Sequence, residues 1–76
     1  MATGDDQLLN KMTGHVIEQI ETRLREAHLV SVNARSFAAQ GLDERAVETL
    51  LGIEPLIYEA KTLLDAVTIV RRMRSI

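Results

Sequence analysis

Few residues in this chain combine the type and the spacing that chemistry requires. His15 and Glu18 are three residues apart, so a helix would carry both side chains on one side, as metal binding can require. A metal site needs three or four converging ligands, and no further ligand has a matching spacing. Ser31, Ser36 and Ser75 have no histidine and carboxylate at a helical offset that could activate a hydroxyl. The sequence therefore predicts no metal site, no cofactor, no small-molecule substrate and no enzyme.

His28 leaves one alternative open. The segment Ala27-His28-Leu29 resembles the phosphoryl-accepting histidine of phosphotransfer domains. Those domains have Lys-Gly after the histidine, where this chain has Val30 and Ser31, and they are usually four-helix bundles longer than this chain. A histidine phosphotransfer protein is therefore kept as an alternative to the main interpretation below.

Residues 37–50 resemble a helix-turn-helix, with Gly41, Val47 and Leu50 at the spacing of that motif. The would-be recognition helix carries four acidic residues against a single arginine, and its carboxylates would face the phosphate backbone. These charges disfavour nucleic acid as a partner. A small DNA-binding transcriptional regulator with a degenerate motif is the second alternative.

The composition is typical of one small helical domain. The chain has 76 residues, of which 46% are apolar, 26% charged and 3% aromatic, and this favours helices over an aromatic-rich β-barrel. A net charge of −2 gives no bulk attraction to nucleic acid or to an anionic membrane. The absence of cysteine excludes disulfides and thiol catalysis. We expect a single domain over residues 1–76, without a signal peptide or membrane span, and a cytoplasmic location.

The first half of the chain predicts one helix over about residues 8–40, after a frayed start at residues 1–6. Apolar and small residues recur there at helical spacing: Leu9, Met12, Val16, Ile20, Leu24, Ala27, Ser31, Ala34 and Ala38. Gly41 suits a left-handed helix end, and Asp43 is a good N-cap for a second helix. The turn at residues 40–43 is short, so the two helices should be antiparallel neighbours.

The second half predicts a helix over about residues 43–74 with a heptad seam facing the first helix. The seam consists of Ala46, Leu50, Ile53, Ile57, Ala60, Leu64 and Val67. Pro55 lacks the amide that would bond to the carbonyl of Leu51, so a kink or break is expected between Leu51 and Glu54. Because the seam keeps its phase across this point, the pattern favours a kink over a reversal of direction.

Each predicted helix has more apolar surface than one neighbour can cover. Outside the seams lie Leu56, Leu63 and Val70 in one row, Ile69 and Met73 in another, and Phe37 near the turn. A short chain without a disulfide or a bound metal rarely builds a sufficient hydrophobic core alone. The sequence therefore predicts an all-α antiparallel hairpin completed by self-association or by a helical segment of a partner protein. The predicted protein-binding residues are Phe37, Leu56, Leu63, Ile69, Val70 and Met73.

Charge is distributed unevenly along the second half. Residues 43–59 contain five acids and one arginine, whereas residues 61–76 contain four bases and one acid. Arg71, Arg72 and Arg74 complement the carbonyls at the end of the helix. Antiparallel self-pairing, or a complementary helix from a partner, would bring opposite charges together.

A first helix, a glycine turn and the segment from Leu56 to Val67 together resemble the small co-chaperones of type III secretion. Those bacterial proteins are antiparallel helical hairpins that hold a needle subunit or another export substrate. The end of the chain is also similar to the small helical antiactivators that sequester quorum-sensing transcription factors. Both resemblances imply the same act, which is covering a partner's apolar helix with an apolar groove. The expected function is sequestration, chaperoning or inhibition of another protein.

Overall fold

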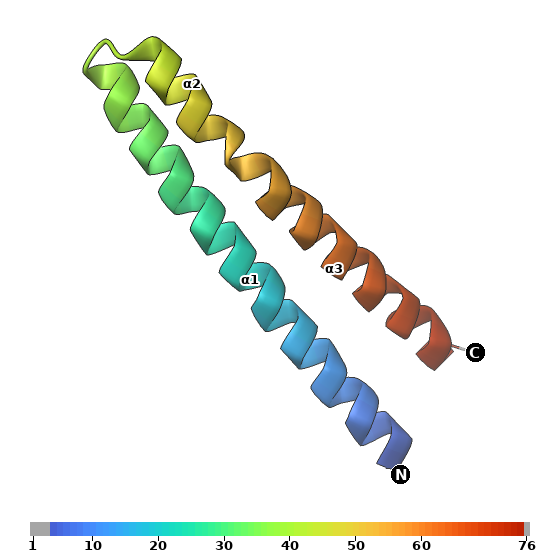
Figure 1. Ribbon diagram of the computed structural model, residues 1–76. Helices are drawn as coiled ribbons and strands as arrows, with labels where there is room; N and C mark the ends of the chain where they lie inside the picture. Colours follow the sequence, from blue (N-terminus) through green and yellow to red (C-terminus); the bar gives the residue numbers. More distant parts are fainter. Residues whose placement is uncertain (1–3, 76) are drawn as a thin grey trace.

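A computed structural model shows the chain as two long helical arms that lie side by side and run antiparallel (Figure 1). The structure describes residues 4–75, and it describes the side chains of residues 7–73. The first arm is helix α1, Gly4–Ala39, and the returning arm consists of α2, Asp43–Leu51, and α3, Ile53–Ser75. About 94% of the described residues are helical, and no strand occurs among them. The predicted all-α antiparallel hairpin is confirmed.

Helix α1 has 36 residues, which corresponds to a length of about 54 Å. It begins at Gly4, so residues 4–6, predicted to be frayed, belong to the helix, while residues 1–3 lie outside the described residues. Gly14 does not interrupt it. One glycine costs about 1 kcal/mol relative to alanine, and extending a helix that already exists costs little.

The turn between the arms is closed by backbone hydrogen bonds at the end of α1. The amide of Gly41 donates to the carbonyl of Ala38, and the amide of Leu42 donates to the carbonyl of Phe37, both at 3.0 Å. Gly41 has a φ of 78°, the left-handed conformation that this helix ending requires. Leu42 is the N-cap of α2, so Asp43 is its first residue rather than its cap. An acid in that first turn still complements the helix dipole.

The returning arm bends by 26° where α2 meets α3. The amide of Gly52 bonds to the carbonyl of Thr49, three residues back, which tightens the last turn of α2. Pro55 is the third residue of α3, where a helix amide has no partner within its own helix, so its missing amide costs little. The chain keeps its direction through this point (Figure 1), and the predicted kink is confirmed.

Substitution of two glycines by alanine should shift stability in opposite directions. Gly14→Ala meets no atom within 4 Å and removes a flexible residue from a helix, so stability should rise by about 0.4–1 kcal/mol. Gly41→Ala should lower stability by about 1 kcal/mol, because its φ of 78° disfavours any side chain. Thermal unfolding followed by circular dichroism measures both changes. An equal shift for the two variants would contradict the assigned backbone geometry.

The two arms pack through one continuous heptad seam. Along α1 a row of buried or half-buried residues recurs in steps of four and three: Leu9, Thr13, Val16, Ile20, Arg23, Ala27, Val30, Ala34 and Phe37. Gln19, Thr22, Ser31 and Val32, beside this row, are half-buried too. The buried or half-buried residues of the returning arm recur in the same steps: Ala46, Thr49, Ile53, Leu56, Ala60, Leu63, Val67 and Val70. Among the described side chains, the most buried ones are four alanines, Ala27, Ala34, Ala46 and Ala60, each no more than 9% exposed. Small residues at these positions let the two backbones approach closely, but they bury little apolar surface.

On the returning arm, the predicted seam was therefore right at every second position and wrong between them. Leu50, Ile57 and Leu64 were expected to face α1, and the structure exposes them. Thr49 and the row of Leu56, Leu63 and Val70 take their places. On α1, Met12, Leu24 and Ala38 are likewise exposed, and Thr13, Arg23 and Phe37 face inward.

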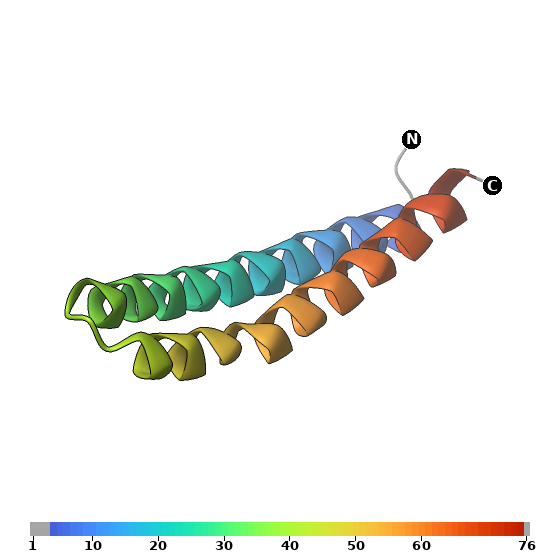
Figure 2. The same ribbon diagram turned by 90° about the horizontal axis from the view of Figure 1, so that it is seen from above.

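The molecule is a single layer of two arms, as the view from above shows (Figure 2). It measures 60 × 15 × 12 Å, and its radius of gyration is 17.6 Å, against about 11 Å for a compact domain of this length. The accessible surface is 6049 Å², whereas a globular monomer of 8.5 kDa exposes about 4,700 Å². Within the described residues, no helix has a stretch apolar and long enough to cross a membrane.

Candidate protein-binding face

The predicted protein-binding residues occupy three different environments. Leu56, Leu63 and Val70 are half-buried in the seam between the arms, which corrects the prediction that this row points outward. Phe37 is half-buried too, with the guanidinium carbon of Arg45 lying 4.9 Å from its ring centre. The other two, Ile69 and Met73, are exposed on α3.

A row of exposed apolar residues follows the seam on each arm. Ile17 and Leu24 on α1 each come one residue after an inward-facing residue, and so do Leu50, Ile57 and Leu64 on the returning arm. Because the arms are antiparallel, residues in this position of the heptad lie on the same side of the hairpin. Between 46% and 57% of the surface of each residue is exposed, and the same holds for Val47 beside them. We call this surface the apolar face: Ile17, Leu24, Val47, Leu50, Ile57 and Leu64.

A shallow groove confirms that both arms contribute to this side. It lies between α1 and α2 and is lined by Ser31, Ala34, Arg35, Ala38, Ala46, Val47 and Leu50. Small residues from α1 form one wall, and Val47 and Leu50 form the other. The groove continues the apolar face toward the turn, so apolar surface extends along three heptads of the hairpin.

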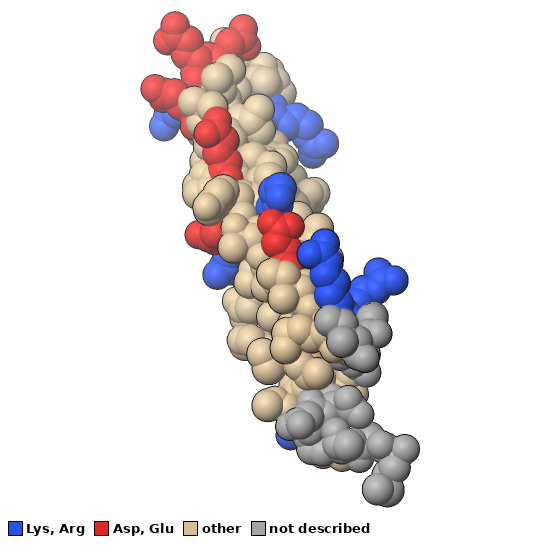
Figure 3. Space-filling model, turned by 90° about the vertical axis from the view of Figure 1, so that its right-hand side faces the viewer, with Lys and Arg blue, Asp and Glu red and all other residues tan. Residues whose placement is uncertain are grey.

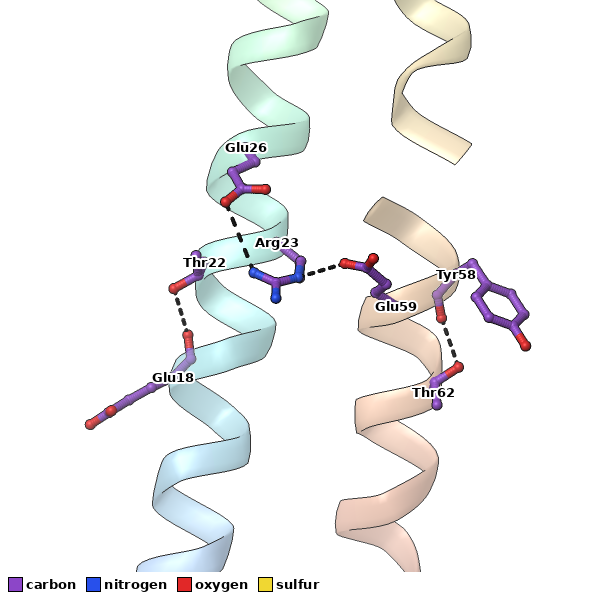
Figure 4. Close-up of polar contacts among 7 residues, drawn as sticks. All are labelled: Glu18, Thr22, Arg23, Glu26, Tyr58, Glu59 and Thr62. Atoms are coloured by element: carbon purple, nitrogen blue, oxygen red, sulfur yellow. Dashed lines mark hydrogen bonds and ion pairs between the residues drawn. The ribbon is translucent and has the colours of Figure 1, made fainter. Parts of the chain in front are cut away.

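The opposite side of the hairpin carries its cross-arm ion pair (Figure 4). Nε of Arg23 donates to Oε2 of Glu59 at 2.6 Å, and a second nitrogen of Arg23 lies 3.9 Å from Glu26. The aliphatic part of Arg23 fills its seam position, while its charged end reaches the side where the two glutamates lie. We call this surface, defined by Arg23, Glu26 and Glu59, the ion-pair side.

The ion-pair side contains apolar residues as well, but charges interrupt them. The heptad positions of Ile69 and Met73 place both on this side, near the end of the hairpin that lies away from the turn, together with Leu8 and Met12. Tyr58 is 73% exposed and points away from α1 (Figure 4). Among the described side chains, those of the apolar face recur at heptad spacing on both arms, without a charged residue in the same row from Ile17 to Leu24 or from Leu50 to Leu64.

The register between the arms is fixed by two side-chain pairs. Arg23 and Phe37 are fourteen residues apart on α1, and their partners Glu59 and Arg45 are also fourteen residues apart. The arms therefore keep a constant register along the hairpin, and Leu24 lies within about one residue of the level of Ile57. Large side chains thus face the same side of the hairpin at matching heights.

The residues considered for chemistry are not brought together. His15 and His28 are both exposed on α1. Among the described residues, no group of three or more histidine, cysteine, aspartate or glutamate side chains could hold a metal ion. In the segment compared with a helix-turn-helix, α2 packs antiparallel along α1 (Figure 1), with Asp43, Glu44 and Glu48 exposed.

Comparison with family models, curated proteins and solved structures found no match to this chain. The interpretation of the apolar face therefore depends on its own geometry and chemistry.

Proposed function

We propose that this chain is a non-enzymatic protein-binding module that holds an amphipathic helix of a partner protein on its apolar face. Six apolar residues there stay about half exposed, although apolar residues at seven-residue spacing are usually buried in helical proteins. Neither arm can cover them, because both arms already pack against each other through a different row. This unpartnered face is the observation that carries the proposal.

The shape of the face suits a helix better than a small molecule or an extended peptide. It is long and shallow, whereas small-molecule sites are concave and enclose most of their ligand. A helix laid in the groove would present its own apolar residues at i, i+3, i+4 and i+7. The hairpin has no sheet edge to which an extended peptide could add, within the described residues.

Covering a partner's helix in this way amounts to sequestration, chaperoning or inhibition of that partner. The resemblances to secretion co-chaperones and to antiactivators suggest two biological settings for the same act. Both would use the hairpin as a stable platform and would need no chemistry from it.

Capture from a lysate of the source organism, followed by mass identification, tests this proposal with a matched pair of variants. Ile57 belongs to the apolar face and Ile69 to the ion-pair side, both lie on α3, and they are 53% and 55% exposed. The parent chain and Ile69→Asp should recover the same protein, and Ile57→Asp should recover at least tenfold less. A helical peptide from the recovered protein should then bind the parent chain and Ile69→Asp with similar affinity and Ile57→Asp more weakly.

Equal recovery by Ile57→Asp and Ile69→Asp would contradict the assignment of the binding face. Recovery of no protein above background by the parent chain would contradict the proposed function itself.

A further inference from the structure

The hairpin exposes enough surface for a second protein chain to cover part of it. The hairpin exposes 6049 Å², about 1,400 Å² more than a globular monomer of its mass. A standard protein–protein interface removes about 800 Å² from each partner. The excess surface of the hairpin is therefore large enough for an interface of standard size.

The apolar face also has the symmetry that pairing with a copy of itself requires. On the returning arm, Ile57 lies midway between Leu50 and Leu64, and on α1 Leu24 lies within about one residue of its level. A two-fold axis that lies in the interface and runs across both arms, through Leu24 and Ile57, would place Leu24 against Leu24 and Ile57 against Ile57 of the copy. It would also place Leu50 of each copy against Leu64 of the other. Such an isologous contact is self-complementary by construction.

Charges beside the apolar face match under the same two-fold axis. Glu54 comes three residues before Ile57 and Lys61 four residues after it, so each would face the other in the copy. The polar residues Glu21 and His28 have the same spacing around Leu24 on α1, and Glu21 also pairs with Arg25 of its own helix. Because these positions flank the apolar face, the pairs would lie at the rim of the interface.

These rim pairs orient the copies more than they strengthen binding. Lys61 already lies 3.2 Å from Asp65 in its own helix, and both side chains are largely exposed. Exposed pairs of this kind contribute about 0–1 kcal/mol each. The apolar face must supply most of the affinity.

The charge of the whole hairpin favours copies whose turns lie at opposite ends. Acidic side chains gather at the end that holds the turn, and basic side chains lie farther along α3 (Figure 3). Copies with turns at the same end would place acid beside acid. With turns at opposite ends, the acidic end of each copy meets the basic part of the other.

We propose that a second copy of this chain covers the apolar face, with the turns of the two copies at opposite ends. The two-fold axis that relates the copies runs across both arms through Leu24 and Ile57. The dimer is a four-helix bundle that supplies the second layer which the hairpin lacks. This inference deepens the proposed function, since the partner's helix would replace the copy on the same face.

Single cysteine variants test the dimer and its symmetry, because the chain has no cysteine of its own. Leu24→Cys alone and Ile57→Cys alone should each form a disulfide-linked dimer under mild oxidation, since each residue meets its own copy at the axis. Leu29 is exposed one residue before the inward-facing Val30, a heptad position on the ion-pair side, so Leu29→Cys is the control and should stay largely uncrosslinked. Circular dichroism before oxidation shows that the three variants keep the helix content of the parent.

Two results would overturn the proposed dimer. If cross-linking occurs only when Leu24→Cys and Ile57→Cys are mixed, the turns lie at the same end, because Leu24 then faces Ile57 of the copy. If Leu24→Cys and Ile57→Cys cross-link no faster than Leu29→Cys, the apolar face is not the contact between copies.

Failure of the dimer and failure of the proposed function give different results. A monomeric chain that still captures a helical partner through Ile57 overturns the dimer and leaves the function standing. A dimer that cross-links through Leu24 and captures no partner overturns the function and leaves the dimer standing.

Discussion

Replacing Leu24 with aspartate should weaken self-association of the chain at least 100-fold. The substitution removes an apolar side chain from the centre of the apolar face and places a charge where water would be excluded. A loss of about 2.7 kcal/mol corresponds to 100-fold, which is modest for a buried charge without a partner. Sedimentation equilibrium over a range of concentrations measures the change in the dissociation constant.

Leu29→Asp is the matched control for that experiment. Leu29 is 57% exposed and Leu24 is 54% exposed, and both are leucines in the middle of α1. The two variants therefore share the loss of helix propensity and the added charge, and they differ in the side of the hairpin. Leu29→Asp should associate within about threefold of the parent chain, because a substitution outside an interface changes little. Equal weakening by both variants would show that the apolar face has no special role.

Replacing Ala60 with leucine should lower stability by about 1–3 kcal/mol, because a larger side chain cannot fit where the arms touch. Ala60 is one of the four buried alanines of the seam. In a domain of this size each 1 kcal/mol lowers Tm by about 4–8 °C, so the effect should be large. The expected structural cause is separation of α3 from α1 near that residue.

Ala66→Leu provides the control, because Ala66 is exposed on the same helix. Leucine and alanine both favour helix, so this change should alter the free energy of unfolding by no more than about 0.5 kcal/mol. Thermal unfolding of the two variants at one protein concentration gives the comparison. If Ala60→Leu is as stable as Ala66→Leu, the arms do not approach each other as closely as the structure indicates.

The fold was largely predictable because its signals are local. Gly41 marks the turn by requiring a left-handed backbone, and Pro55 marks the bend by lacking an amide. Apolar spacing in steps of three and four then leaves helices as the main choice, and a short turn makes them antiparallel.

The binding face was harder to predict because two heptad rows looked alike. Leu56 and Leu63 form one row and Ile57 and Leu64 the next, and both combine with the alanines at positions 46 and 60 into a regular seam. Leucine and isoleucine in neighbouring positions give no compositional reason to choose between them. The choice depends on how each arm rotates about its axis, which is a property of the packing and not of either helix alone.

One signal for the correct rotation was present on α1. Arg23 occupies a seam position in the structure. A prediction from the spacing of apolar residues assigns that position to Leu24 instead. The partner of Arg23, Glu59, lies on the same side as Glu26, and the three charges together mark the side of the hairpin opposite the apolar face. Matching charges between the two arms would therefore have indicated the rotation that apolar spacing left open.

The molar mass of the unmodified chain in solution tests the central claim most directly. If a second copy shelters Leu24 and Ile57, light scattering should give a mass near twice 8.5 kDa at micromolar concentration, decreasing toward the single-chain value on dilution. A mass of 8.5 kDa that stays constant up to millimolar concentration, in a fully helical chain, would contradict it.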